Sequence, residues 1–358
     1  MAGKRYGNMA GSYDGELYGE SVYERIGSTE DPISGGADGG HSPLLRNWQT
    51  GETFFLRRVN LENRWVKNAY FRRILEPPRT ERIFWPVDLL PLPDELRAEC
   101  TLFVDHEYVP LHTPPEQRKG EYAVALPMPK DKKRTSGTER LARLKKNWKD
   151  EKTRNVAVQL TEAVADVNRE GYLYHDFHPS RICFGDKERL FLDYSNLACS
   201  YGERIEEADA FLRKPEKNTY PLEFAAPGII QGQNATLSFR SQNYSLCAFL
   251  FYLLIGRYAY DGALLAGYPD DNPYNHDVKF RDYHKLPIFI FDPDNTSNAV
   301  GAFEEDKAVV RLWEECPEEL RGWFVHTLCL RPNGLEEATD YPTAENWLAL
   351  FRRLGWSK

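Results

Sequence analysis

Three short hydrophobic runs, separated by polar turns, lie close together between residues 170 and 195. They are Tyr-Leu-Tyr at 172–174, Ile-Cys-Phe at 182–184 and Leu-Phe-Leu at 190–192. Such runs, bounded by polar turns, predict the order strand, loop, strand, strand. Asp176 follows the first run and Asp193 follows the third. This arrangement would hold two carboxylates close enough to bind a divalent cation or to accept a proton from a nucleophile. The alternative is two unrelated acids exposed in turns.

Longer apolar patterns predict helices. Residues 155–170 repeat apolar side chains at helical spacing, and Gly171 ends the pattern. Residues 61–75 have a mixed helical spacing and predict one long helix. Residues 246–255 are apolar on every side, which predicts a buried core helix, and the run is too short to span a bilayer.

The first part of the chain is polar at its start and then predicts strands. Residues 1–30 are rich in glycine, tyrosine, serine and acids, which predicts a flexible tail. Strands are expected at 50–59, at 82–90, and at either 100–105 or 122–128. We favour the second of these two, because Pro127 and Pro129 stiffen the chain there and a charged stretch follows. A glycine-rich hairpin at 33–41 precedes them, and it is either a plain flexible loop or a loop whose backbone N–H groups approach phosphates. The candidate phosphate-binding residues there are Ser34, Gly35, Gly36 and Gly39.

Composition narrows the class of protein. The chain has 358 residues, 41% of them hydrophobic, and a net charge of −8, so nothing favours nucleic acid as the main partner. The six cysteines include no C-x-x-C pair, which favours buried thiols over disulfides or zinc sites. We see no signal peptide and no membrane-spanning run, so the sequence predicts a cytoplasmic protein without a membrane partner.

The opening segment resembles the catalytic core of eukaryotic-like protein kinases. That family carries H-R-D-L-x-x-x-N followed by a metal-binding D-F-G, and this chain carries HDFHPSR at 175–181 and DYS at 193–195 in the same order and spacing. Weaker matches follow the family order, namely FAAPG at 224–228, QNYSLCAFLFYLLIG at 242–256, CPEELR at 316–321 and YPTAENWL at 341–348. Together they cover about residues 30–355.

The resemblance implies an α+β, two-lobed protein-kinase-like fold. A small antiparallel-sheet N-lobe is expected at 31–129 and a mainly helical C-lobe at 130–358, after the tail at 1–30. The implied catalytic positions are Asp176, which accepts the hydroxyl proton, together with His178 and Arg181, and the implied metal ligand is Asp193. The implied nucleotide-binding positions are the four in the glycine-rich hairpin together with Arg57, Leu126 and Met128. Arg57 stands where kinases have a phosphate-binding lysine, although a surface arginine on a strand is the alternative.

The positions at which this chain differs from the family pattern are those that bind metal or take part in catalysis in kinases. Arg181 replaces the asparagine that holds a second Mg²⁺, and a guanidinium repels a cation. His178 replaces the usual lysine, Ser195 replaces the glycine of D-F-G, and no helix glutamate is found to pair with Arg57. We therefore expect a pseudokinase that acts as a binding or regulatory module for an unknown protein partner. The alternative is an active, divergent serine/threonine kinase. ATP and a weakly held Mg²⁺ are the implied cofactors, with nucleotide binding weak and little dependent on Mg²⁺.

Overall fold

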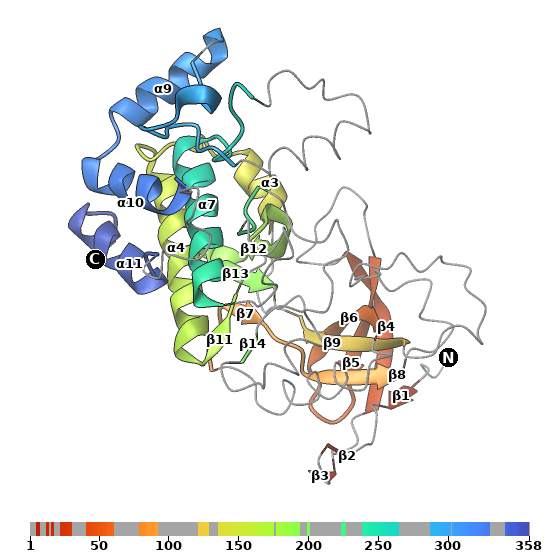
Figure 1. Cartoon of the computed structure of the whole chain (residues 1–358). Coiled ribbons are helices and arrows are strands. Elements are labelled where there is room, and N and C mark those ends of the chain that lie inside the picture. Colours follow the sequence, from red (N-terminus) through yellow and green to blue (C-terminus); the bar gives the residue numbers. More distant parts are fainter. Residues whose placement is uncertain are drawn as a thin grey trace. The chain divides into compact units, whose positions relative to one another are not determined.

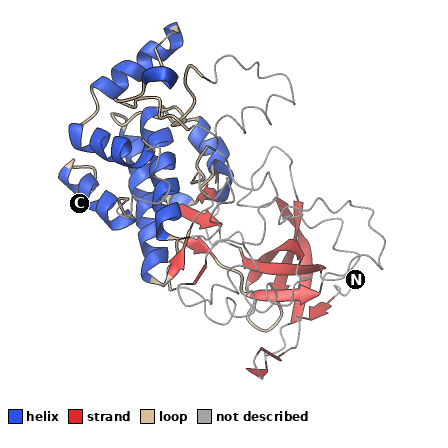
Figure 2. Ribbon diagram, in the orientation of Figure 1, coloured by secondary structure: helices blue, strands red, loops and turns tan. Residues whose placement is uncertain are grey.

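The computed structural model shows an α+β protein that divides into two compact units (Figures 1 and 2). The first unit comprises residues 1–142 and 179–219, and the second comprises 143–178 and 220–358. The residues that the structure describes are 5–7, 12–13, 16–17, 22–30, 41–60, 79–91, 121–128, 135–174, 177–193, 199–200, 223–226, 238–264, 287–301, 303–329 and 341–357. No helix among them is long and apolar enough to cross a bilayer. Their four described cysteine side chains are all free thiols.

A six-stranded antiparallel sheet forms the larger part of the described first unit. Its order is β1-β4-β5-β6-β9-β8. The bounds are Arg5–Gly7 for β1, Val22–Glu30 for β4, His41–Asn47 for β5, Thr53–Asn60 for β6, Glu121–Pro127 for β9 and Asp88–Pro91 for β8. The strands expected at 50–59 and 122–128 are confirmed. The flexible tail expected at 1–30 is wrong over β4, because this segment pairs with β5 from Tyr23 to Glu30, with a shift in register between Arg25 and Gly27.

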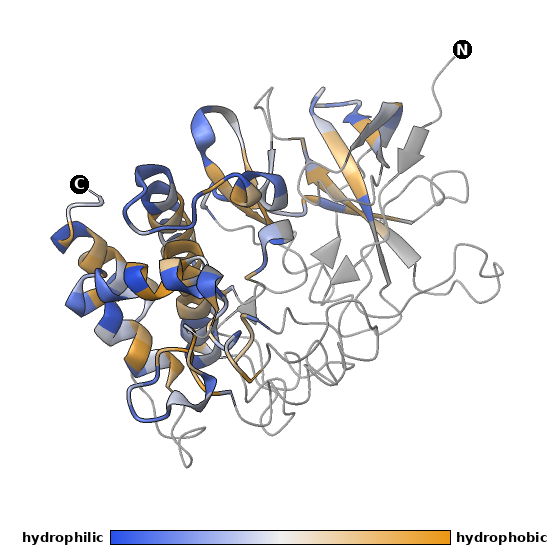
Figure 3. Ribbon diagram, turned by 90° about the horizontal axis from the view of Figure 1, so that it is seen from above, coloured by the Kyte–Doolittle hydropathy of each residue, from blue (hydrophilic) through white to orange (hydrophobic). Residues whose placement is uncertain are grey.

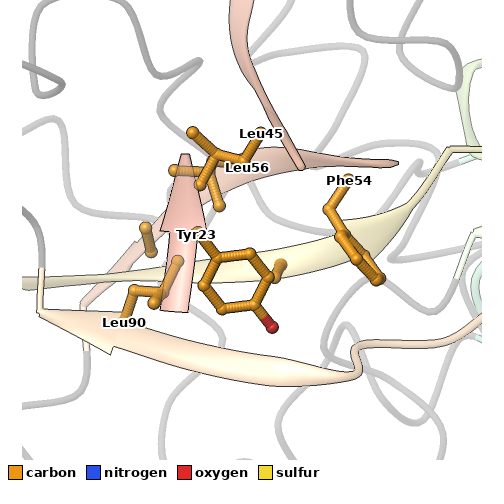
Figure 4. Packing of buried hydrophobic residues seen from close by; sticks show 7 residues of the cluster. Tyr23, Leu45, Phe54, Leu56 and Leu90 are labelled. Carbon is orange, nitrogen blue, oxygen red and sulfur yellow. The ribbon is translucent and has the colours of Figure 1, made fainter. Parts of the chain in front are cut away.

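The sheet curls around a small apolar core. Its two outermost strands, β1 and β8, contact each other. The core cluster consists of Tyr23, Leu45, Phe54, Leu56, Leu90, Ala123 and Ala125 (Figure 4). Across the curl, the Tyr23 hydroxyl donates a 2.7 Å hydrogen bond to Asp88 Oδ2, which joins strands that are not neighbours in the sheet. This bond and the burial of the cluster hold the sheet in its curled form.

A second, four-stranded sheet in the same unit has the order β10-β12-β13-β7. The bounds are Thr135–Ser136 for β10, Ile182–Phe184 for β12, Leu190–Asp193 for β13 and Ile83–Phe84 for β7. Strands β12 and β13 form a hairpin, as the apolar runs predicted. The single strand expected at 82–90 is instead two strands, β7 and β8. These two strands belong to different sheets. The chain passes from one sheet to the other at Trp85 and Pro86, which are both buried.

Short elements complete the first unit. Helix α3 (Gly137–Ala142) begins at Ser136, whose hydroxyl accepts from the Glu139 N–H. The 3₁₀ turns η2 (Pro179–Arg181) and η3 (Asp186–Glu188) flank β12. Strands β2 (Ser12–Tyr13) and β3 (Glu16–Leu17) pair with each other, and β14 is Cys199–Ser200.

The second unit is mainly helical. Its elements are α4 (Glu151–Arg169), β11 (Tyr172–Leu173), α7 (Phe239–Ile255), η4 (Thr296–Asn298), η5 (Glu304–Asp306), α9 (Lys307–Glu314), α10 (Glu318–Leu328) and α11 (Ala344–Arg353). Helix α7 packs against both α4 and α10, and α11 packs against α4. The helices of this unit carry both orange and blue residues (Figure 3), and the apolar side chains that α10 and α11 bury, such as Phe324 and Trp347, belong to the core of the unit.

Helix α7 is the centre of that core. All of its residues from Ser241 to Ile255 are buried, including Phe249 and Leu253 at 0% exposure. The helix begins at a Ser238–Ser241 capping box and ends at Gly256, whose φ of 82° needs a residue without a Cβ. The prediction of a buried helix at 246–255 is therefore confirmed. The helix expected at 155–170 is confirmed as α4, which is followed by Gly171 with a φ of 84°.

The boundary expected at 129/130 does not coincide with the division that the structure shows. Residues 135–142 belong with the first unit because β10 pairs with β12 and because Gly137 lies against Pro179 and Ile182. The β12–β13 hairpin, expected in the C-lobe, belongs there for the same reason. The chain therefore passes from the first unit to the second between residues 142 and 143.

The start of α4 gives a direct test of local stability. The Asp150 carboxylate accepts hydrogen bonds from the Thr153 N–H at 3.0 Å and from the Thr153 hydroxyl at 3.1 Å. Burial raises the pKa of Asp150. The two hydrogen bonds and the nearby charges of Lys145 and Lys152 lower it by more, so the pKa lies below its ordinary value. We expect Asp150→Ala to lower the free energy of unfolding by about 1 kcal/mol at neutral pH, measured by urea denaturation.

The matched control is Asp150→Asn, which keeps an oxygen that can cap the helix and should cost much less. Because the folded-state pKa of Asp150 is depressed, its carboxylate stabilises the fold above its unfolded pKa. This contribution is lost as the pH falls through the folded value. The difference between wild type and Asp150→Ala should therefore shrink only in strong acid. A difference that disappears near neutral pH would contradict this account.

Candidate functional site

Arg57 lies on the face of the curled sheet opposite the apolar cluster. Phe54 and Leu56 of β6 belong to the cluster, so Phe55 and Arg57 point to the other face. Arg57 is fully buried, and its Cζ lies 5.7 Å from the centroid of the Phe55 ring. The alternative of a surface arginine is therefore wrong. An arginine is rarely fully buried unless its charge is paired.

Two further predicted nucleotide-binding residues lie beside Arg57. In β9, Ala123 and Ala125 face the cluster, so Val124 and Leu126 share the face of Arg57. The register pairs Arg57 with Val124 and Phe55 with Leu126, which makes Arg57 and Leu126 diagonal neighbours. Leu126 is fully buried. Met128 follows the strand, is half-buried, and donates its N–H to Thr53 O at 2.8 Å.

The hairpin β12–β13 brings Arg181 and Asp193 to one end. Ile182 pairs with Leu192, so Arg181 and Asp193 are the next residues beyond this last pair. Their Cα atoms are at most about 13 Å apart, which is one strand spacing plus one residue on each side. Arg181 is half-buried and ends η2. The described part of Asp193 is its backbone, at the end of β13.

A short connection ties this hairpin end to the Arg57 face. Asp193 pairs with Phe84 of β7, and three residues later the Val87 N–H donates to Ala125 O at 2.9 Å. Three residues span at most about 11 Å. Leu126 is the next residue along β9. The two groups of predicted site residues in the first unit are therefore linked through main-chain pairing.

A buried polar network in the second unit was not found by the sequence analysis. Gln242 of α7 is fully buried, and its Oε1 accepts from the Tyr174 N–H at 2.7 Å and from Asn168 Nδ2 at 2.9 Å. Its Nε2 donates to Asn168 Oδ1 at 2.9 Å, and Asn168 Nδ2 also donates to Tyr172 O at 2.9 Å. The network fixes the backbone that leads to Asp176 against α4 and α7. The signal that could have revealed it is the group of polar residues at 240–245, directly before the apolar run of the same helix.

The packing around Phe177 fixes the other side of the same loop. Its ring lies edge-on to Tyr174 with centroids 5.2 Å apart and also contacts Phe249 of α7 at 6.3 Å. Phe177 is 1% exposed. His178, the predicted replacement for the family lysine, follows it and is half-buried. Tyr174 and Phe177, the described residues on either side of 175–176, are therefore both held in the core of the second unit.

Several predicted site residues lie outside the described part of the chain. These are Asp176, Ser34, Gly35, Gly36 and Gly39. The residues that flank the glycine-rich segment are described, and Glu30 pairs with His41 in the antiparallel β4–β5 register. The helix expected at 61–75 is also outside. The prediction that Asp176 and Asp193 lie near each other stays a prediction.

The donor set can be compared with what Mg²⁺ requires. Mg²⁺ prefers oxygen ligands, and the position that holds the second ion in kinases carries the guanidinium of Arg181 here. The described side chains form no group of three or more His, Cys, Asp or Glu residues that could hold a metal, but those of Asp176 and Asp193 are not among them. The prediction that Asp193 is a metal ligand therefore stays a prediction, and a guanidinium at Arg181 could not serve as an oxygen ligand for a second ion.

Comparison with known proteins does not assign this chain to a family. Neither a scan against protein-family models nor a search of curated proteins finds a match to this chain.

Proposed function

We propose that this chain is a two-lobed protein-kinase-like domain, and that it is a pseudokinase acting as a binding or regulatory module with weak or no phosphotransfer. Support for the fold comes from the curled antiparallel sheet, the mainly helical second unit and the core helix α7. The anchored backbone before Asp176 supports a scaffold that keeps the catalytic-loop position in place. The partner is a protein, in the cytoplasm, and neither nucleic acid nor a membrane is needed.

The observation that carries the proposal is Arg181 at the same hairpin end as Asp193. A cation bound at Asp193 would meet a like charge near the place where the family supplies an oxygen ligand. Two unit charges 4 Å apart repel by about 4 kcal/mol at an effective dielectric of 20. Loss of the second ion removes much of the charge neutralisation on which phosphoryl transfer depends. The geometry thus favours binding over catalysis.

One observation favours the alternative, an active divergent serine/threonine kinase. Arg57 is fully buried on a face that it shares with Leu126. The chain therefore keeps a positively charged side chain at the position where kinases have their phosphate-binding lysine. An arginine preserves the charge of the family lysine, although its planar head and longer stem change the geometry. Catalysis with a single ion at Asp193 would then use Arg57 and Arg181 on the phosphates.

A phosphotransfer assay separates the two functions. We expect the purified chain, given labelled ATP with Mg²⁺ or Mn²⁺, to label neither itself nor a generic serine/threonine substrate above the level of its Asp193→Ala variant. The control is Asp294→Ala, an exposed acid in a turn of the second unit. Labelling that disappears in Asp193→Ala and persists in Asp294→Ala would overturn the pseudokinase proposal in favour of the active kinase.

A further inference from the structure

A concentration of positive charge lies in the second unit, away from the candidate site of the first. Residues 143–154, here called the basic segment, run from the start of this unit through the first turn of α4. They contain six basic and two acidic residues, in a chain whose net charge is −8. Arg143, Lys145, Lys149 and Lys152 are all exposed. The segment is therefore a strongly basic surface on an acidic protein.

The backbone of the basic segment is fixed to the core of the second unit. The Trp148 N–H donates to Leu254 O of α7 at 2.7 Å, and its indole Nε1–H donates to Leu312 O of α9 at 3.1 Å. Lys146 is held as well, because its ammonium lies 4.4 Å from the centroid of the Tyr252 ring. A ligand would therefore meet charges on a backbone that is already ordered, which lowers the entropic cost of binding.

Two lysines of this segment are not used by the fold. Lys145 and Lys152 both lie near Asp150, whose pKa burial raises and whose bonds to Thr153 and two neighbouring lysine charges lower. The Asp150 carboxylate is already bonded to the Thr153 N–H and hydroxyl. Within the described residues neither lysine forms an ion pair, whereas Lys149 is paired with Glu315. Two neighbouring ammonium groups are thus left for an external anion.

The basic surface continues onto the end of α11. The Arg154 Cζ lies 5.9 Å from the centroid of the Trp356 ring, which places the start of α4 beside the end of α11. Arg352, one turn before Trp356, is exposed and has no ion-pair partner in the part of the chain that the structure describes. At the other end of the same helix pair, Arg169 is paired with Glu345 at 3.3 Å. Positive charge is therefore balanced at one end of the helix pair and left over at the other.

We propose that the basic segment binds a short acidic segment of a partner protein, with Lys145 and Lys152 pairing with its carboxylates. The inference rests on the proposed binding function, to whose partner it gives a chemistry, and it does not depend on the candidate site in the first unit. A nucleic acid or an anionic membrane extends beyond a short basic surface and would meet the acidic remainder of the chain. A segment with only a few carboxylates avoids this repulsion.

The test is fluorescence polarisation of the full chain with a labelled peptide of alternating glutamate and serine, in about 0.15 M salt. We expect the double variant Lys145→Gln/Lys152→Gln to bind about tenfold more weakly than wild type, which corresponds to about 1.4 kcal/mol and lies within the range of two exposed ion pairs. The matched control is Lys187→Gln/Lys307→Gln, which removes two exposed lysines elsewhere and changes the net charge equally. It should bind as wild type does, and the same peptide with glutamine in place of glutamate should not bind.

The other outcomes also decide the matter. No binding of the acidic peptide by wild type, with circular dichroism showing a folded chain, overturns the inference, and so does equal weakening by the two double variants. Tighter binding to duplex DNA or to phosphatidylserine vesicles than to the peptide overturns the protein partner in favour of that polyanion. Phosphotransfer that depends on Asp193, together with the expected peptide binding, overturns the pseudokinase but upholds the basic segment as a docking surface of an active kinase.

Discussion

Replacement of Gly137 by alanine should lower the free energy of unfolding by about 3 kcal/mol, at the upper end of the cost of overpacking a core. Gly137 is the first residue of α3 and is buried. A Cβ there would collide with Pro179 O and Ile182 Cγ1 and would lie 2.6 Å from Ile182 O. Two of these three atoms belong to the backbone, so relief requires η2 or β12 to move. Because η2 ends at Arg181, the substitution should also disturb the hairpin end that carries the candidate site.

The matched control for this substitution is Gly322→Ala. Gly322 lies in the interior of α10, is exposed, and has no atom within 4 Å of the Cβ that alanine would add. Alanine should stabilise this helix by about 0.5–1 kcal/mol. Urea denaturation of both variants decides the matter. If Gly137→Ala proves as stable as Gly322→Ala, then α3 does not pack on the hairpin as the structure has it.

The sequence predicted those elements whose pattern of apolar residues lies within one short stretch of the chain. Residues 246–255 of helix α7 are apolar on every side, and the runs that became β12 and β13 are short, apolar and bounded by polar turns. The end of α4 was predictable because Gly171 adopts the left-handed conformation that favours glycine. In each case the signal and the structure that it predicts lie in the same stretch of chain.

Features that depend on distant partners were not predictable in this way. Strand β4 reads as a polar tail because Tyr23 is its main buried side chain, and its backbone is ordered by pairing with β5. The first unit extends to residue 142 because α3 meets η2 and β12, which lie far along the chain. Of the candidate site, the sequence indicated that Arg57 and Leu126 belong together, but it left the burial of Arg57 open.

Replacement of Gln242 by leucine should cost about 2–4 kcal/mol, although leucine suits the apolar surroundings of α7. Gln242 is the shared partner of the Tyr174 N–H and of both polar atoms of the Asn168 amide. Leucine would leave the buried Tyr174 N–H and the half-buried Asn168 Oδ1 without this partner, although Asn168 Nδ2 keeps its bond to Tyr172 O. Each unsatisfied buried group costs about 1–3 kcal/mol. Such networks lose more than one bond at a time when a shared member is removed. Chemical denaturation measures the loss.

The same substitution should release the loop that leads to Asp176, and this second effect distinguishes the network from simple core packing. We expect the Tyr174 amide hydrogen to exchange with solvent faster in Gln242→Leu than in wild type, at matched global stability. Gln242→Glu should fall between the two, because a carboxylate still accepts from Tyr174 but cannot donate to Asn168 Oδ1. Gln49→Leu, in an exposed turn of the first unit, should change neither quantity. If Gln242→Leu destabilises the chain but leaves Tyr174 exchange unchanged, then Gln242 supports only the core, and the loop before Asp176 is held by Phe177 and its aromatic neighbours instead.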